Sequence, residues 1–352
     1  MVWAEGKDSD SIRKKPRIGI PMSSPRVAII VLNWNNWRDT LECLASLDRL
    51  EYQNHYIWIV DNGSRNDSCR QIIQGLEHMG HRAMVLNEEE AWNAKSLTAL
   101  RPSTDISIRP HVLIRLEENY GYAGGNNRAL ELAGRSGYDY VWLLNNDTRV
   151  SADALRELVN SAERDERVSM VVSNLVNIIE NRAVQDQCHY LKDLQVEVES
   201  LAGGSILVRT DCLADIGLID EKYFCYGEEL DWSLRARRRG WKLIRNYRSI
   251  VFHKWGSSTQ SKRIEKKFLG RKIVRISWQG FLTPGYYESR NGIYFMKKNQ
   301  HSLWVPYAIF RTLHLILQLV LYDDHKWGRM QIVLKGAWDG VRGRMGKTEI
   351  SL

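Results

Sequence analysis

The fold of this chain is constrained most by short apolar runs that alternate with helical patterns through its first half. The runs are rich in branched and aromatic residues, and segments with helical spacing separate them. This alternation predicts a mostly parallel β-sheet, because parallel strands need long connections, usually helices that pack on the sheet. The expected strands are residues 26–34, 56–61, 112–116 and 140–144, and the expected helices lie near residues 39–50, 68–79, 126–135 and 152–164.

Each expected strand ends in polar or glycine-rich residues, namely NWNN, DNGS, ENYGYAGGNN and NNDT. The carboxyl ends of parallel strands meet at one edge of a sheet, where ligands bind in open α/β folds. One strand that ends in Asn or Asp is explained by turn chemistry and by capping of the next helix. Four such strands predict a polar cleft, in which Asp147 is a candidate metal or phosphate ligand.

The chain length and the cysteines bound the class of protein. With 352 residues and 43% hydrophobic content, the chain is expected to be globular, with one large domain or two smaller ones. Five scattered cysteines without a C-x-x-C pair argue against a disulfide framework and against a thiolate zinc site, and they favour the reducing cytoplasm. Residues 1–25 lack the apolar run of a signal peptide and are expected to form a flexible arm.

Positive charge is concentrated in the second half of the chain. From Ser233 onward there are 25 Lys and Arg against 6 Asp and Glu, a net charge of +19. Because the whole chain has a net charge of +8, the residues before Ser233 have a net charge of −11. A basic tail suits nucleic acid, anionic lipid or a phosphorylated substrate, and charge alone does not choose among them. The tail contains no recognisable DNA or RNA module, so no nucleic-acid partner is expected.

The pattern changes along the rest of the chain. Residues 87–111 are rich in charge, Ser and Thr, and predict a surface insertion. Residues 168–177 and 205–210 are expected strands, and a further strand ends at His253. Residues 229–239 predict a helix with an acidic first turn, a basic last turn and a stop at Gly240.

In order along the chain come VLNWNN, VDNGS, ENYGYAGGNN, LLNNDT, AGGS, GEELDWSLRARRRGW and FHKWG. With these motifs the chain resembles the glycosyltransferase family 2 enzymes of GT-A fold, and most of all the bacterial rhamnosyltransferase-like branch that builds cell-surface polysaccharides. The resemblance covers about residues 27–299. It implies an α/β catalytic domain at residues 26–280, followed by a helical basic region at 281–352. It also implies inverting transfer from a nucleotide-activated sugar to a hydroxyl acceptor, with a divalent metal, Mn²⁺ or Mg²⁺.

The resemblance also assigns roles to residues. Asn145, Asn146 and Asp147 fall where the family has its D-x-D metal motif, of which only the last carboxylate is present. His253 matches a histidine that helps to hold the metal or the diphosphate. Glu228 and Glu229 fall on an acidic pair whose second member acts as base. For the nucleotide-facing side, the matching residues are Asn33, Asn35 and Asp61.

Elementary chemistry supports these roles and leaves alternatives. A divalent ion neutralises the charge that develops on a leaving diphosphate, and a carboxylate with an imidazole suits Mn²⁺ at least as well as Mg²⁺. Inversion needs a base opposite the leaving group, and the neighbouring charges of Glu228 and Asp231 favour a raised pKa in this cluster. The alternative interpretation is that these acids are ordinary residues of a helix N-terminus, stabilised by the helix dipole, and that His253 is a buried histidine without a metal.

Two glycine pairs also flank the expected cleft. Gly124 and Gly125 let backbone approach a ligand closely, and Asn126 is expected to begin the next helix with its amides facing that ligand. The alternative is a glycine-rich turn from strand to helix. Gly203 and Gly204 leave room for sugar or acceptor, or permit a bend.

The tail contains an apolar stretch at residues 303–322, in which Arg311, His314 and Gln318 share one helical face. This spacing favours a helix that lies in a membrane interface, and nearby cations would bind anionic headgroups. The chain is then expected to be peripheral on the inner face of the cell membrane through residues 297–335, and to use a saccharide or lipid-linked acceptor. The alternative is an amphipathic helix that packs on the catalytic domain or a partner. The cations concerned are Lys297, Lys298, Lys326, Arg329 and Lys335.

The expected reaction is therefore transfer of rhamnose or a similar hexose, with dTDP-rhamnose as the favoured donor. The first competing hypothesis is a catalytically silent nucleotide-sugar binding protein, because the D-x-D motif is incomplete. A basic nucleic-acid-binding protein is the weaker competitor, since only the charge of the tail favours it.

Overall fold

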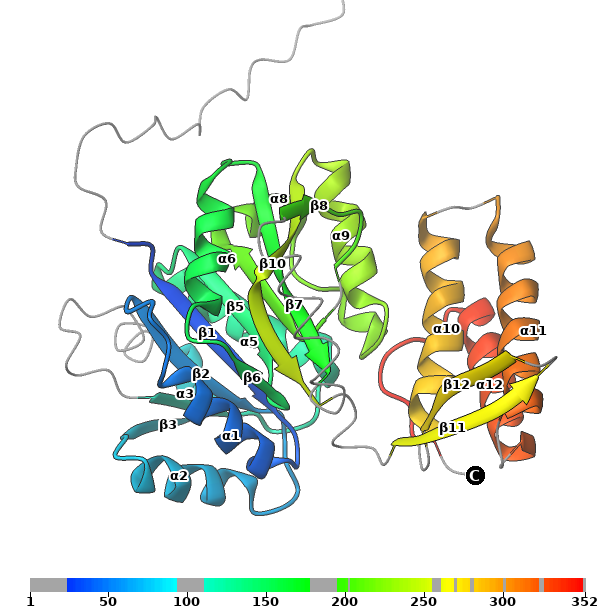
Figure 1. The fold of residues 1–352 in the computed structure, drawn as a ribbon, viewed down its shortest axis with the longest axis horizontal. Helices are drawn as coiled ribbons and strands as arrows, with labels where there is room; N and C mark the ends of the chain where they lie inside the picture. The colour runs from blue at the N-terminus through cyan, green and yellow to red at the C-terminus, as the bar shows by residue number, and fades with distance from the viewer. Residues whose placement is uncertain are drawn as a thin grey trace, which may run out of the picture.

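The computed structural model describes residues 24–93, 111–177, 195–201, 203–254, 261–268, 271–278, 282–299, 302–322 and 326–350. Within them the chain forms a mixed α/β domain with a central sheet, followed by C-terminal helices (Figure 1). The predicted fold class is thereby confirmed. The predicted N-terminal arm lies almost wholly outside the described residues.

Five parallel strands form one half of the sheet. β1 (Val27–Asn33) pairs in parallel with β2 (His55–Asp61) on one side and with β5 (Tyr140–Asn145) on the other. Beyond β2 follow β4 (His111–Arg115) and β3 (Ala83–Asn87), which are also parallel. The carboxyl ends of these strands therefore meet at one edge, as the alternation of runs predicts.

The other half of the sheet is mixed. β9 lies antiparallel between β5 and β7, and β7 pairs in parallel with β10. The short strand β6 pairs antiparallel with β10, in a register that sets His253 opposite Thr148. This register brings the end of β10 to the turn that contains Asp147. The strands of this half are β6 (Thr148–Val150), β7 (Val168–Asn177), β8 (Gln195–Glu197), β9 (Ser205–Arg209) and β10 (Lys242–His253).

Helices cover both faces of the sheet (Figure 1). Residues of α1, α2 and α6 pack on one face, and residues of α5 and α9 pack on the other. The helices of this domain are α1 (Trp37–Leu47), α2 (Ser68–His78), α3 (Glu88–Trp92), α5 (Gly121–Ser136), α6 (Ala154–Glu163), α8 (Leu213–Ile216) and α9 (Glu228–Arg238), with the 3₁₀ turns η2 (Thr210–Cys212) and η3 (Glu221–Tyr223).

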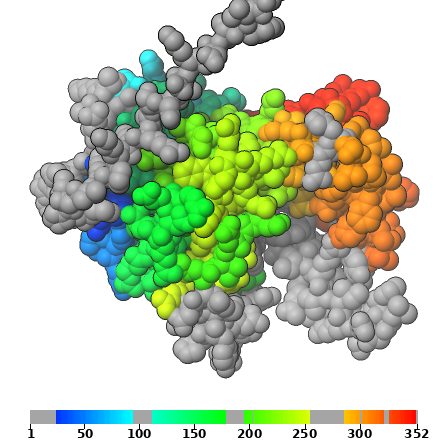
Figure 2. All heavy atoms as spheres, turned by 90° about the horizontal axis from the view of Figure 1, so that it is seen from above, coloured from blue at the N-terminus to red at the C-terminus, as the bar shows by residue number. Residues whose placement is uncertain are grey.

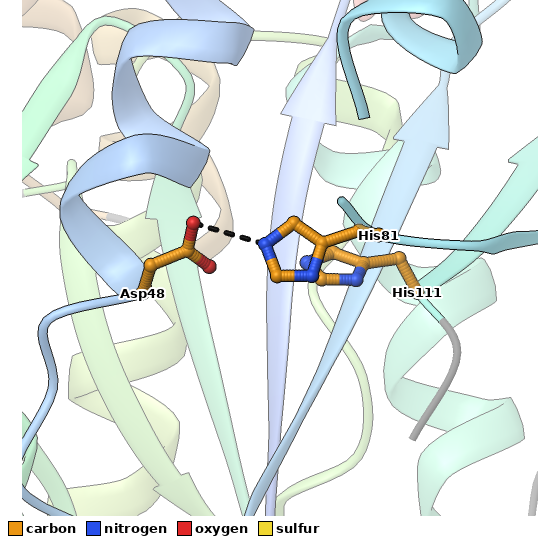
Figure 3. Close-up of side chains that lie close together, drawn as sticks. All are labelled: Asp48, His81 and His111. Carbon is orange, nitrogen blue, oxygen red and sulfur yellow. Dashed lines mark hydrogen bonds and ion pairs between the residues drawn. The ribbon is translucent and has the colours of Figure 1, made fainter. Parts of the chain in front are cut away.

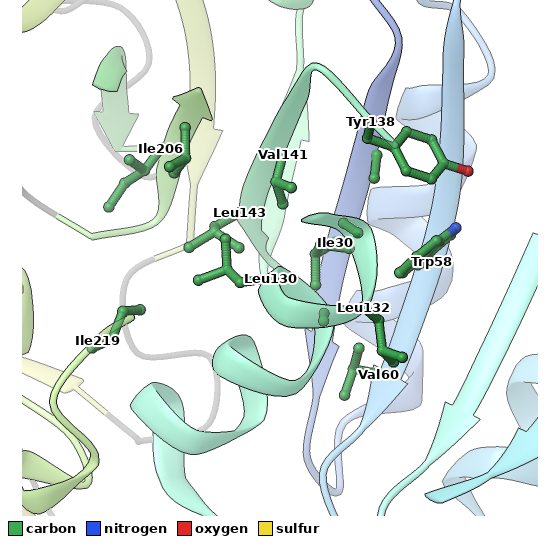
Figure 4. Close-up of a cluster of buried hydrophobic side chains, with 14 of the residues drawn as sticks. Ile30, Trp58, Val60, Leu130, Leu132, Tyr138, Val141, Leu143, Ile206 and Ile219 are labelled. Carbon is green, nitrogen blue, oxygen red and sulfur yellow. The ribbon is translucent and has the colours of Figure 1, made fainter. Parts of the chain in front are cut away.

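The two cores follow from the two-residue period of a strand. In β1, Ala28 and Ile30 face one core while Ile29 and Val31 face the other, and all four are fully buried. Figure 4 shows Leu130 of α5 beside Leu143 of the sheet, with Ile30 in the same core. Because both faces are covered, the strands are continuous apolar runs rather than alternating ones.

The C-terminal region is a small helical unit with a two-stranded antiparallel sheet, β11 and β12. Tyr286, Tyr287 and Ile332 form its buried cluster, and Phe224 from the α/β domain packs against them. Figure 2 shows these helices gathered at one end of the molecule, next to the residues of α9. The elements are β11 (Ser261–Phe268), β12 (Arg271–Trp278), α10 (Leu282–Asn299), α11 (Trp304–Tyr322) and α12 (Lys326–Arg342).

Two sequence expectations need correction. The helix expected to begin at Asn126 begins at Gly121, five residues earlier, in a stretch whose glycines argue against a helix. The expected insertion at residues 87–111 begins with regular structure, because α3 starts there with a capping box between Asn87 and Glu90. The strand β3 before it was missed, and residues 94–110 lie outside the described part of the chain.

Candidate active site

Polar side chains at the ends of β1, β2 and β5 form one connected group. The Asn33 side-chain amide donates to an Asp61 carboxylate oxygen at 2.7 Å, and the Thr40 hydroxyl donates to Asn33 Oδ1 at 2.9 Å. The Asn146 amide donates to Thr40 Oγ1 at 3.1 Å and reaches Asn33 Oδ1 at 3.4 Å. Asn35 has a left-handed φ of 56° and accepts from the Arg65 N–H at 2.8 Å. These contacts join the polar ends of three adjacent strands.

Asp147 and His253 face each other next to this group. An Asp147 carboxylate oxygen lies 3.3 Å from His253 Nε2, and both side chains are largely buried. Asn145 Nδ2 lies 3.2 Å from the same nitrogen. Burial raises the pKa of Asp147 and lowers that of His253, although their mutual attraction opposes both shifts. Burial therefore favours the neutral imidazole, the form that binds a metal.

The backbone at Gly203 and Gly204 connects this pair to the acidic helix α9. A Cβ atom at Gly204 would lie 3.3 Å from His253 Cδ2, and a Cβ at Gly203 would lie 2.0 Å from Glu229 Oε1. Gly204 also has a φ of 109°, which residues with a side chain rarely adopt. His253 and Glu229 thus approach the same two-glycine segment from either side. A side chain at Gly203 would displace the Glu229 carboxylate, and one at Gly204 would strain the backbone and crowd His253.

The carboxyl groups of α9 are held in a water-poor place. Glu228 is buried, and its Oε2 has no hydrogen-bond partner among the described residues. Burial, and then the charge of Glu229, raises the pKa of Glu228 well above its ordinary value. Burial also raises the pKa of Glu229. The pair therefore holds protons more tightly than surface carboxyls do.

The loop before α9 is conformationally demanding. Phe224, Tyr226 and Gly227 all have positive φ angles, of 64°, 69° and 91°. The Asn291 amide of α10 donates to the carbonyl oxygens of Tyr223, Cys225 and Tyr226, at 3.0, 2.7 and 2.7 Å. A residue of the C-terminal region thus holds the backbone that carries Glu228 and Glu229.

Asp231 lies on α9 but has different neighbours. It is fully buried, 2.9 Å from Arg235 Nε and 2.8 Å from Lys298 Nζ. The Tyr223 hydroxyl also donates to it, at 3.4 Å. Asp231 therefore anchors α9 to α10 through ion pairs.

Gly124, Gly125 and Asn126 lie inside α5 and not at its beginning. A Cβ at Gly125 would lie 2.7 Å from Leu32 Cδ1, so this glycine permits close packing of α5 on β1. Asn126 is buried, and its amide donates to the Tyr122 carbonyl oxygen at 2.9 Å. The backbone N–H groups of the first helical turn, which were expected at residue 126, therefore belong to Gly121 and the residues that follow it.

Sequence reasoning missed three residues of the site. Tyr122 is hydrogen-bonded to the Gly204 backbone, and its hydroxyl would lie 3.7 Å from a Cβ at Gly203. Lys254 Nζ lies 2.5 Å from Asp39 Oδ1. The backbone N–H of Lys254 donates to the backbone carbonyl oxygen of Asp147 at 3.0 Å. The position of Lys254 directly after His253 is a signal that the sequence offers. Asn291 offers no local signal.

A mixed α/β domain with a central sheet flanked by helices is the architecture of GT-A glycosyltransferases. The chain belongs to the family "Glycosyl transferase family 2", which it matches over residues 28–98 and 107–212.

Two comparisons place the chain among known proteins. It is 29% identical over 144 residues to uncharacterized proteins of Mycobacterium tuberculosis and Mycobacterium bovis, a match that covers 39% of this chain and 54% of each relative. The chain thus spans about half the length of these curated relatives. It also resembles a mannosyltransferase of Pyrobaculum calidifontis solved with GDP-Man and Mn²⁺. That likeness has a TM-score of 0.54 at 14% identity, covers 94% of this chain and 92% of the other, and shows a shared fold.

Proposed function

We propose that this chain is an inverting, metal-dependent glycosyltransferase that moves a sugar from a nucleoside diphosphate donor to a hydroxyl of a saccharide or lipid-linked acceptor. The observation that carries the proposal is the continuous arrangement of Asp147, His253, Gly204, Gly203 and Glu229. Asp147 contacts His253. His253 lies so close to Gly204, and Glu229 so close to Gly203, that a Cβ atom on either glycine would crowd its neighbour. A candidate metal pair and a candidate base therefore flank one narrow segment of backbone.

The donor set at Asp147 and His253 fits a divalent cation. A hard carboxylate oxygen and an imidazole nitrogen lie 3.3 Å apart in a largely buried place. A bound divalent ion would neutralise charge on the leaving diphosphate. The GDP-Man and Mn²⁺ complex of the mannosyltransferase with a similar fold supports a nucleotide sugar and a divalent metal here.

Glu229 is the proposed base. In a single displacement the acceptor oxygen forms a bond to the anomeric carbon while the bond from that carbon to the diphosphate oxygen breaks. The proton of the acceptor hydroxyl passes to the Glu229 carboxylate, and the nucleoside diphosphate leaves. A raised pKa makes Glu229 a stronger proton acceptor than a surface carboxylate. Glu228, which lies next to Glu229 in the chain, favours its neutral form because burial raises its pKa.

Asn33, Asn35, Asn145, Asn146 and Asp61 are proposed to face the nucleotide. Hydrogen bonds from Asn33 to Asp61, from Asn146 to Asn33 and from the Arg65 N–H to Asn35 preorganise the turns after β1, β2 and β5. Rhamnose from dTDP-rhamnose is the proposed donor, through the resemblance to the rhamnosyltransferase-like branch, with cell-surface polysaccharide as product. A panel of nucleotide sugars tested by thermal shift, with and without Mn²⁺, would identify the donor, because a preferred ligand stabilises the folded state by mass action.

The decisive variant is Glu229→Gln, assayed for sugar transfer with Mn²⁺ and after chelation with EDTA. We expect it to bind donor normally and to lose transfer by at least about 100-fold, since general base catalysis contributes about 10²–10⁴. The matched control is Glu199→Gln, a highly exposed acid on the same domain. Near-normal transfer by Glu229→Gln would remove Glu229 as the base. EDTA-resistant transfer would remove the metal requirement.

A catalytically silent nucleotide-sugar binding protein is the second candidate. Asn145 places an amide, and not a second carboxylate, beside His253, so Asp147 is the one carboxylate assigned to the candidate metal site. This protein would bind donor with Mn²⁺ and neither transfer nor hydrolyse it. Release of nucleoside diphosphate that depends on both Mn²⁺ and Glu229 would exclude it.

We also propose that the C-terminal helices hold the protein at the cytoplasmic face of a membrane. Among the described helices, one is long and apolar enough to cross a bilayer, α11 over Trp304–Leu321. Its large apolar side chains point outward: Ile309, Phe310 and Leu313 are 58%, 69% and 61% exposed. Exposed apolar area of this kind marks an interaction surface.

Two of the cations expected to bind headgroups are already engaged within the protein. Lys298 Nζ lies 2.8 Å from both Asp220 and Asp231, and Lys297 Nζ donates to the Val341 carbonyl oxygen at 2.8 Å. The proposed contact therefore relies on Lys326 and Lys335, which are exposed on α12, and on exposed Trp327.

A further inference from the structure

A second cluster of metal-ligating side chains lies at the opposite edge of the sheet. Asp48 caps the carboxyl end of α1, His81 follows α2, and His111 is the first residue of β4. The active-site residues follow the carboxyl ends of the strands, whereas this cluster lies where β4 begins. Figure 3 shows the three side chains directed toward one another from three separate segments.

The ligand atoms are close together. His81 Nε2 lies 3.0 Å from Asp48 Oδ2, and the rings of His81 and His111 are 4.5 Å apart between centroids. One ligand atom from each of the three residues lies within 4.8 Å of the others. An ion with bonds of about 2.1 Å in tetrahedral geometry sets its ligands about 3.4 Å apart. The side chains of Asp48 and His81 are about one third exposed, so they have room to close this difference.

The buried member of the cluster has an unsatisfied nitrogen. His111 is 6% exposed, and its Nε2 has no hydrogen-bond partner in the described part of the chain. Such a nitrogen has lost its water without gaining a bond, which is rare for buried polar atoms in folded proteins. Burial, then the neighbouring His81, lowers the pKa of His111 to about 4, so its imidazole is neutral at pH 7.

We propose that Asp48, His81 and His111 form a structural site for a divalent transition metal ion of the zinc type, separate from the pair of Asp147 and His253. Two imidazole nitrogens and one carboxylate oxygen are a ligand set that zinc accepts, with water in a fourth position. The bound ion would link the end of α1, the connection between α2 and β3, and the start of β4. Three elements that meet only at their ends would then be fixed together.

The test uses the full-length chain carrying Asp147→Asn, which removes the carboxylate of the proposed catalytic site. After EDTA treatment and desalting, calorimetry should find one Zn²⁺ per chain, and Zn²⁺ should raise the thermal midpoint. Adding His81→Ala should abolish both effects, and because His81 is partly exposed this change leaves the core intact. Co²⁺ should give the visible absorption of a low-coordinate site in the parent and not in the His81→Ala variant.

The matched control is His78→Ala, an exposed histidine three residues earlier on α2. It should bind Zn²⁺ as the parent does. Equal binding by the His81→Ala variant, or no Zn²⁺ bound by the Asp147→Asn parent, would overturn the site. Neither result depends on sugar transfer, so failure of this site and failure of the proposed function are distinguishable.

Discussion

At the scale of single residues, Glu228 is a carboxyl group that the fold removes from water. It is buried beside Glu229, and its Oε2 has no hydrogen-bond partner among the described residues. A carboxyl group in such a place is stable only while it keeps its proton. The residue therefore links the stability of the fold to pH.

Glu228→Gln is expected to change this pH dependence. In the unfolded chain Glu228 loses its proton near its ordinary pKa of 4.5, while in the folded chain it keeps it to higher pH. The wild-type free energy of unfolding should therefore fall as pH rises above about 4.5, by this contribution. Gln has no proton to lose, so the stability of the variant relative to wild type should increase with pH. Urea titrations between pH 4 and 8 measure this, and a difference that stays constant would contradict it.

Gly203→Ala should displace the proposed base. The new Cβ would lie 2.0 Å from Glu229 Oε1, and the flexible end of Glu229 is the part that can move. We expect kcat for sugar transfer to fall at least about tenfold, a barrier change of about 1.4 kcal/mol, with little change in thermal midpoint. The control is Gly134→Ala in α5, where a Cβ meets nothing within 4 Å, and which should gain about 0.5–1 kcal/mol of stability. Unchanged kcat in Gly203→Ala would argue against Glu229.

At the scale of elements, α10 supports the loop that precedes α9. Arg290 is fully buried and donates to the Tyr223 carbonyl oxygen at 3.0 Å, beside the three bonds from Asn291. Its guanidinium carbon also lies 4.6 Å from the centre of the Tyr287 ring. The proposed base is thus positioned by a helix that lies more than fifty residues later in the chain.

Asn291→Ala should uncouple the loop from α10. The carbonyl oxygens of Cys225 and Tyr226 lose the Asn291 donor, while that of Tyr223 keeps Arg290, and we expect the loss to cost about 1–3 kcal/mol. We also expect kcat to fall while the donor KM changes little, because the positive-φ residues would relax and move Glu229. Kinetics and thermal melts, measured where the variant is fully folded, separate the two effects. Asn299→Ala on the same helix is the control, and an equal loss of kcat there would contradict a specific role for Asn291.

At the scale of the whole molecule, the C-terminal helices lie at one end (Figure 2) and carry several exposed large apolar side chains. Arg311, on the polar face of α11, forms an ion pair with Glu288 of α10 at 3.4 Å. The polar face of α11 is thus turned partly toward the protein, while an apolar stripe at Ile309, Leu313 and Leu317 is left exposed. A surface helix in a soluble domain usually exposes a polar face, so this exposed apolar stripe is unusual.

The double variant Phe310→Ser with Leu313→Ser should weaken membrane binding. Each large apolar side chain contributes about 1.5–3 kcal/mol when it leaves water, so partition onto anionic liposomes should fall more than tenfold. Flotation measures the bound fraction. Val85→Ser, an exposed apolar residue of β3, is the control and should leave binding unchanged. If the wild-type protein does not bind liposomes and is a dimer that the double variant dissociates, the surface belongs to a protein interface instead.

The sequence alone determined the parallel sheet, its polar edge and the family. These depend on patterns local to each strand and helix: the apolar runs that become β1, β2, β4 and β5, and the Asn and Asp residues at their ends. The beginning of α5 was predicted too late because its first turns contain glycines, which have weak helix propensity. Tertiary packing of α5 on Leu32 outweighs this weak propensity.

Only the tertiary structure decided which distant residues meet. The pairing of Asp147 with His253 follows from the register of β6 against β10, and the contacts of Asn291 with the loop before α9 cross more than sixty positions. The cluster of Asp48, His81 and His111 exists because three elements end at the same corner of the sheet. No local pattern encodes these contacts, because they result from the packing of whole elements against one another.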